Sequence, residues 1–187
     1  MNFLMGMLLR PDSTWAAIAG ERMSTSHALR LILPLCLLPA AATVIGMSVF
    51  NTGWDAMHGY QTGENRIFAI GLANVLFAVI TILTLALAFH WLAVPAGKAR
   101  APFAEALKLA GFGAVPVLLA GGLLVLPVMA MLTLVAAVYS LYLYHLGMQK
   151  LLGIRSEDAV MMLAICVVLV SVVAGTLGAV ISAYGML

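Results

Sequence analysis

The sequence predicts an all-α integral membrane protein, a bundle of five transmembrane helices preceded by an amphipathic helical segment at the membrane interface. Of its 187 residues, 64% are hydrophobic and 9% are charged, and the mean hydropathy is +1.13. A soluble domain carries about 45–50% apolar and about 25% charged residues. The formal charge of +2, without a basic tract interleaved with aromatic residues, argues against nucleic acid as a partner.

Residues 1–26 are predicted to lie on the membrane surface. Apolar residues recur at helical spacing both before and after Pro11. They are Phe3, Leu4, Met7 and Leu8 in the first stretch and Trp15 and Ile18 in the second. We expect a pair of interfacial helices with Trp15 at the depth of the lipid headgroups. The alternative is a frayed polar end of the chain.

Residues 27–187 are predicted to form the membrane domain. A crossing takes about 20 apolar residues. Apolar segments of suitable length cover residues 31–50, 67–94, 105–121, 127–145 and 159–184. No charge lies between Lys108 and His145. We therefore expect a tight turn within Gly121 to Pro127, where glycine supplies unusual backbone angles.

Lysine and arginine residues predict the orientation of the chain. Eight of the nine lie on the same side of the membrane as the N-terminus, and only Arg66 lies on the other side. Because cytoplasmic loops carry the excess of positive charge, the N-terminus is expected in the cytoplasm and the C-terminus outside.

Polar side chains are few within the predicted spans. At 100° per residue, one face of the fourth span and one face of the second span each carry polar residues. They are Tyr139, Tyr142, His145 and Gln149 on the fourth and Asn74 and Thr81 on the second. They indicate either a path for a solute or proton, or hydrogen bonds between helices worth roughly 0.6–2 kcal/mol each. The second is favoured, because the span centres hold no ionisable residue.

The stretch SLYLYHLGMQKLLGIRSEDAV, from Ser140 to Val160, is interpreted as the cytoplasmic exit of the fourth span. Tyr142, His145 and Gln149 are expected to face protein, and Tyr144 to face the headgroups. Gly147 and Gly153 are expected to permit the reversal of the chain.

Four basic residues are candidates for contact with anionic lipid headgroups. They are Lys98, Arg100, Lys150 and Arg155. Each charge near such a surface contributes on the order of 1 kcal/mol. The alternative is that they only determine topology.

The sequence contains no catalytic or cofactor-binding motif. His90 and His145 lack a third metal ligand at a characteristic spacing. Glu157 and Asp158 stand at the predicted start of the fifth span, where acids favour the helix dipole. We therefore expect no enzyme activity, no metal and no cofactor.

Small residues recur every four positions on two of the spans. They are Ser171, Gly175, Ala179 and Ala183 on the fifth span, with Ala174, Gly178 and Ser182 beside them, and Ala106, Ala110 and Ala114 on the third. Such stripes permit close approach of helices. We expect them to knit the monomer together rather than to form a dimer seam.

Three stretches together resemble the Yip-one domain of the Ypt/Rab-interacting membrane proteins, in its short bacterial form. They are RPDSTWAAIAGE, FAEALKLAGFGAVPVLL with its Pro116, and LYLYHLGMQKLLGIRSEDAV. The resemblance covers nearly the whole chain and implies a five-helix membrane domain in the bacterial inner membrane. Eukaryotic relatives act in vesicle trafficking, bind prenylated small GTPases and associate with each other. They carry a longer cytosolic N-terminal region, and its lack here argues against GTPase binding.

The expected function is that of a non-enzymatic membrane scaffold that binds membrane-protein partners, copies of itself or lipids. The alternative is a transporter or channel for a small solute or lipid. Helices broken at Pro34, Pro39 or Pro116 would favour transport. A water-accessible cavity lined by Asn74, Thr81 and Tyr142 would be its distinguishing feature.

Overall fold

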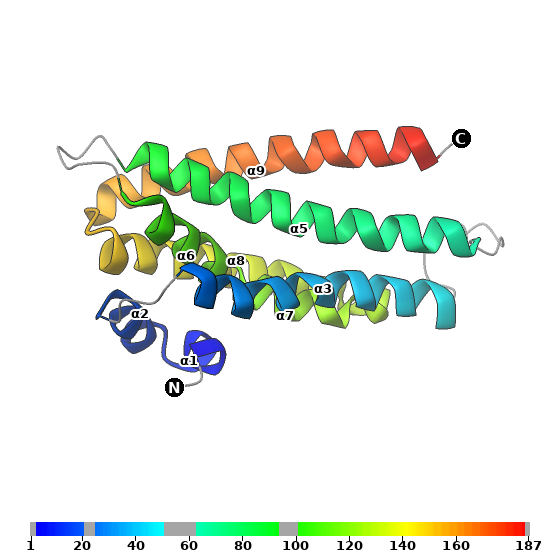
Figure 1. Cartoon of the computed structure of the whole chain (residues 1–187), viewed down its shortest axis with the longest axis horizontal. Coiled ribbons are helices and arrows are strands. Elements are labelled where there is room, and N and C mark those ends of the chain that lie inside the picture. Colours follow the sequence, from blue (N-terminus) through cyan, green and yellow to red (C-terminus); the bar gives the residue numbers. More distant parts are fainter. Residues whose placement is uncertain (1–2, 21–24, 51–62, 94–100, 186–187) are drawn as a thin grey trace.

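A computed structural model describes residues 3–20, 25–50, 63–93 and 101–185 of the chain, and all regular structure in these ranges is helical (Figure 1). Four helices are long and apolar enough to cross a membrane. They are α3 (Thr25–Val49), α5 (Glu64–Leu92), α8 (Ala130–Leu151) and α9 (Ser156–Gly185). A fifth crossing exists if the bent pair α6 (Phe103–Gly113) and α7 (Val115–Gly121) forms one span. The predicted all-α membrane fold is confirmed.

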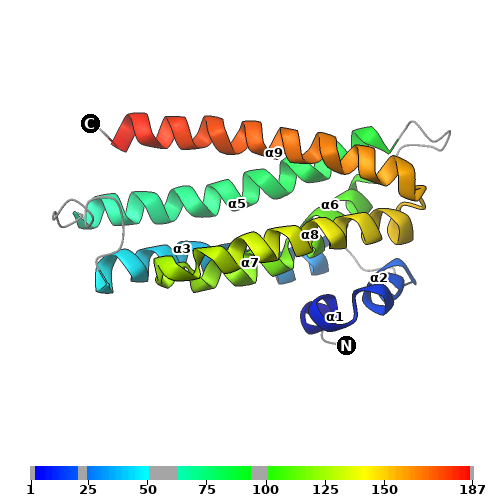
Figure 2. The same cartoon turned by 180° about the vertical axis from the view of Figure 1, so that it is seen from behind.

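The long helices run along the long axis of the molecule, and the two chain ends lie at opposite ends of that axis (Figures 1 and 2). The short helices α1 (Phe3–Leu9) and α2 (Pro11–Gly20) are seen nearly end-on beside one end of the bundle. We call α1 and α2 the hairpin and this end of the bundle the hairpin end. The start of α6, the end of α8 and the start of α9 lie at the same end.

The break in the third span lies at Ala114, between α6 and α7. Pro116 follows two residues later, and its ring has no N–H and crowds the carbonyl of Phe112 four residues before it. The two parts differ in direction by 41°. Pro34 and Pro39, by contrast, both lie inside the continuous helix α3.

Two short 3₁₀ helices, η1 (Gly122–Val125) and η2 (Pro127–Met129), make the turn between the third and fourth spans. The turn falls where the sequence predicts it, but the predicted role of glycine is wrong. Gly121 and Gly122 have ordinary helical backbone angles, with φ of −58° and −64°. Gly121 instead allows close packing, because a Cβ there would lie 2.6 Å from Cγ of Pro39 on α3.

The best-buried side chains gather near the hairpin end. Every residue from Ala106 to Gly113 on α6 is buried. The largest fully buried side chains nearby are Met7, Trp15, Ile18, Phe89, Leu109, Phe112, Leu143 and Met148. The hairpin therefore packs on the bundle through its buried side chains.

Trp15 shows this most directly, because its side chain is covered by protein and not by lipid headgroups. Its side chain is 0% exposed and packs on Gly147 of α8, beside Leu109 of α6. Its periodicity with Ile18 does predict an apolar stripe on α2. The stripe is covered by protein because Gly147 leaves room for the indole ring.

Gly147 and Gly153 were both expected to reverse the chain, and only Gly153 does so. Gly153 has a φ of 64° in the loop between α8 and α9, a left-handed conformation that favours glycine. Gly147 lies within α8, which continues to Leu151. Its role is packing, since it has no Cβ to displace Trp15.

Candidate functional site

The six polar candidates do not converge on one site. Asn74 on α5 donates to Oγ1 of Thr43 on α3, with 3.1 Å between Nδ2 and Oγ1, and Thr43 donates to the carbonyl of Pro39 at 2.8 Å. Thr81, two turns further along α5, has a buried Oγ1 with no hydrogen-bond partner among the described residues. Asn74 thus acts between two helices, as the structural interpretation expects.

Tyr139 and Tyr142 of α8 lie side by side, with ring centroids 5.9 Å apart. The hydroxyl of Tyr139 donates to the carbonyl oxygens of Met7 at 3.2 Å and Leu8 at 3.1 Å, so it joins α8 to the last turn of α1. Tyr142 is 47% exposed. The expectation that Tyr142 faces protein is therefore wrong.

His145 and Gln149 form a polar pair near the end of α8. Nε2 of Gln149 donates to Nε2 of His145 at 2.7 Å, which leaves the ring proton on Nδ1. Ser156, at the start of α9, lies 3.4 Å from the same ring nitrogen. The three residues connect the end of the fourth span to the start of the fifth.

Tyr144 is buried at 6% exposure, so the prediction that it faces the headgroups is wrong. Its hydroxyl donates to the carbonyl of Ala110 on α6 at 3.1 Å. Its ring lies 5.6 Å from the ring of Phe89 on α5, centroid to centroid. Gly113 makes room for the ring, because any Cβ there would overlap Tyr144. Tyr144 therefore holds three spans together next to the break at Ala114.

Two of the four basic candidates are paired with carboxylates. Nζ of Lys150 lies 3.3 Å from Oδ1 of Asp12 on the hairpin, and Nε of Arg155 lies 3.1 Å from Oδ2 of Asp158. A small cavity of about 70 Å³ borders this second pair, between the end of α5 and the start of α9. Neither Asn74 nor Thr81 of α5 lines this cavity, and none of the four polar candidates of α8 lines it. Lys98 and Arg100 lie outside the described residues.

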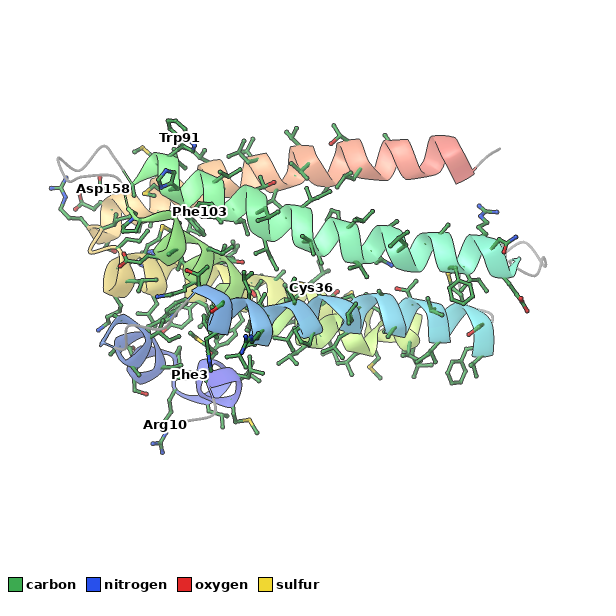
Figure 3. All side chains as sticks on the ribbon, viewed as in Figure 1. Phe3, Arg10, Cys36, Trp91, Phe103 and Asp158 are labelled. Carbon is green, nitrogen blue, oxygen red and sulfur yellow. The ribbon has the colours of Figure 1, made fainter. Side chains whose placement is uncertain are left out.

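His90 and His145 serve different local structures. Nδ1 of His90 lies 2.7 Å from the carbonyl of Ala101, to which it donates, and its ring meets those of Trp91 and Phe103 edge-on. In Figure 3, Trp91 lies at the end of α5 and Phe103 at the start of α6. Among the described residues, no group of three or more His, Cys, Asp or Glu side chains could hold a metal.

The two small-residue stripes differ in burial. Ala106, Ala110 and Ala114 are buried on α6, as expected. On α9, Gly175 and Gly178 have no atom within 4 Å of where a Cβ would stand, and Ser171 and Ala179 are exposed. The expectation that this second stripe knits the monomer together is wrong over its described side chains.

Lys108 is the residue that the sequence analysis missed. We expected it only to orient the chain, yet it is buried on α6 at 8% exposure. It forms no ion pair or hydrogen bond with any described residue. The signal available in the sequence was its position four residues before Phe112, with apolar residues on either side of it in the helix.

A comparison with protein-family models matches the Yip1 domain over residues 5–177. Comparisons with curated proteins and with solved structures gave no match. The matched range includes most of the hairpin, the bent third span and the loop before α9. The chain belongs to the Yip1 domain family.

Proposed function

We propose that this protein is a non-enzymatic membrane scaffold that binds a transmembrane helix of a partner through the outer face of α9. The observation that carries the proposal is the uncovered small-residue stripe on that helix. Membership of the Yip1 domain family, a family of non-enzymatic membrane proteins, supports the absence of catalysis.

Helix α9 has two faces of different character. Ala159, Met162 and Cys166 are buried against the rest of the bundle. Gly175 is nine residues after Cys166, which places it about 180° around the helix at about 100° per residue. The stripe is thus directed away from the face by which α9 packs on α5 and α8.

The stripe suits a helix better than it suits lipid. Small residues let two backbones approach closely, and interfaces between transmembrane helices are enriched in them. Helix α9 is also the least covered span, since 11% of its apolar window is buried, against 28–33% for α3, α5 and α8. A partner helix would supply the packing that the chain itself does not.

We place the hairpin end in the cytoplasm and assign the protein to the bacterial inner membrane. The distribution of basic residues supports this orientation. Lys150 and Arg155 lie at the hairpin end with Arg10 on the hairpin, whereas Arg66 begins α5 at the opposite end. Positive charge collects on the cytoplasmic side of membrane proteins.

Transport has less support. Of the polar groups that would line a path, Asn74 is used between helices and Tyr142 is directed outward. The described cavity lies at the hairpin end and away from them.

Site-specific photo-crosslinking in native membranes tests the proposal. A photoreactive residue at Gly175 should form adducts with a polypeptide. The same residue at Leu134 on α8, which is 63% exposed and outside the stripe, should capture lipid only. The mass of the adduct distinguishes a second copy of the chain from another protein. Lipid adducts alone at Gly175 would contradict the proposal.

A variant provides the matched control. Gly175→Leu should abolish co-purification of the captured partner, because its side chain prevents close approach of the helices. Val135→Leu enlarges a side chain that is 66% exposed on α8 and should leave co-purification unchanged.

A further inference from the structure

Lys108 is a largely covered cation without a partner among the residues that the structure describes. Its side chain is more than nine-tenths covered, and no described carboxylate lies within ion-pair distance. Glu105 stands three residues earlier on the same helix and forms no ion pair with it. An uncompensated buried charge is costly, so some anion or water must meet this ammonium.

The contacts of α6 show where the side chain is directed. Phe112 meets the ring of Phe3 on α1, with centroids 6.4 Å apart, and a Cβ on Gly111 would meet Ile32 on α3. At about 100° per residue, Lys108 lies between these two directions on the helix circumference. Its side chain therefore leaves α6 between α1 and α3.

The ammonium is not completely enclosed, although the side chain as a whole is covered. The buried polar atoms without a partner in the described part of the chain are Nε1 of Trp15, Oγ1 of Thr81 and Oγ of Ser140. Nζ of Lys108 also has no partner among the described residues. Unlike these three atoms it is not fully enclosed, so an opening leads to it. Covered methylenes with an accessible charge are the arrangement by which lysine reaches the membrane interface.

The opening lies near the hairpin end of the bundle, where α6 begins. Lys108 is five residues into α6, or about 7–8 Å along the helix axis at about 1.5 Å per residue. Helix α1, whose Phe3 packs on Phe112 of α6, lies across the direction of the spans (Figure 1). Its Met5, Leu8 and Leu9 are 57%, 38% and 73% exposed, an apolar surface suited to acyl chains.

We propose that Lys108 binds the phosphate of an anionic phospholipid whose acyl chains lie against the exposed apolar side of α1. The lipid phosphate supplies the negative charge that the protein lacks at this position. The side chains of Lys150 and Arg155 are already paired with Asp12 and Asp158 and are less suited to this role. Arg10 extends away from the bundle (Figure 3). The site does not depend on partner binding by α9.

The first test uses the wild-type chain in lipid nanodiscs and measures acetylation of lysines by an uncharged amine reagent. The ratio of Lys108 to Lys150 acetylation should fall when phosphatidylglycerol replaces part of the phosphatidylcholine. An unchanged ratio would overturn the proposal. Inorganic phosphate added to phosphatidylcholine nanodiscs should leave the ratio unchanged. A fall with phosphate would show a site for soluble anions and would also overturn the lipid assignment.

The second test compares variants by thermal unfolding in detergent with added phosphatidylglycerol. A lipid that binds only the folded chain raises the unfolding midpoint. The rise should persist in Lys108→Arg and in the control Lys150→Gln, and it should be lost in Lys108→Gln. An equal rise in Lys108→Gln and in the wild type would overturn the proposal. If Lys108→Gln does not fold, the acetylation ratio of the wild type decides alone.

Discussion

Trp15 of the hairpin and Gly147 of α8 are in direct contact. A Cβ at position 147 would lie 2.8 Å from Cζ2 and 2.9 Å from Cε2 of the indole ring, closer than real Cβ atoms approach other atoms. The contact places a residue from the first turns of the chain against the end of the fourth span. The hairpin is thereby attached to the bundle by packing, in addition to the bonds from Tyr139.

Gly147→Ala should therefore destabilise the protein by about 1–3 kcal/mol, the usual cost of adding a methyl group to a well-packed site. Unfolding in detergent measures this loss. Gly178→Ala is the matched control, because nothing lies within 4 Å of its Cβ position. It should leave stability unchanged or raise it by up to about 1 kcal/mol, since alanine favours helix over glycine. Equal effects of the two substitutions would contradict the packing role of Gly147.

Iodide quenching should show that Gly147→Ala also loosens the hairpin. In a background with Trp54→Phe and Trp91→Phe, the remaining Trp15 should be protected in the wild type, where it is 0% exposed. The Gly147→Ala substitution should increase quenching. Protection that persists in the variant would mean that the ring shifts without leaving the bundle.

Tyr144→Phe should cost about 0.5–1.5 kcal/mol, the typical net contribution of a hydrogen bond. The substitution removes the bond to Ala110 and retains the ring that packs on Phe89. Tyr142→Phe is the control on the same helix, since Tyr142 is 47% exposed and should change stability little. A larger loss of stability for Tyr142→Phe than for Tyr144→Phe would contradict the assignment of Tyr144 as the buried, hydrogen-bonded tyrosine.

Asn74 and Thr43 should be energetically coupled across α5 and α3. A double-mutant cycle with Asn74→Ala and Thr43→Val should give a coupling of about 0.6 kcal/mol and at most about 2 kcal/mol, as for other hydrogen bonds between membrane helices. Ser48 bonds to carbonyl oxygens of its own helix, so Asn74→Ala combined with Ser48→Ala should be additive. Additivity in the first cycle would show that the Asn74 bond contributes nothing measurable.

Cysteine labelling should place the hairpin end in the cytoplasm. The native Cys36 and Cys166 are buried and should not react in the folded protein. Val128→Cys, at a site that is 74% exposed at the opposite end, should react with an impermeant maleimide in intact cells. Arg155→Cys, whose native side chain is 79% exposed, should react only after permeabilisation. The reverse pattern would overturn the proposed orientation.

Several features of the fold were predictable because they depend on local chemistry. Apolar length predicts the spans. Pro116 was one of three prolines at which a break was considered, because proline removes a backbone donor, but Pro34 and Pro39 lie within the continuous helix α3. Gly153 was predictable for a similar reason, since a chain reversal after a helix favours a left-handed residue. The polar candidates were harder. Their spacing groups them on faces, but spacing does not identify the helix that covers each face.

The sequence by itself determined the number of apolar segments, the helical class and the family, because these follow from composition, periodicity and a pattern that spans most of the chain. Only the tertiary structure decided which faces are covered. In the folded chain, Tyr144 and Trp15 are buried, the stripe around Gly175 is exposed and Lys108 is largely covered. In a membrane protein, apolar residues face both lipid and protein, so hydrophobicity does not distinguish the two. Packing between particular side chains and glycines decides which faces are covered by protein.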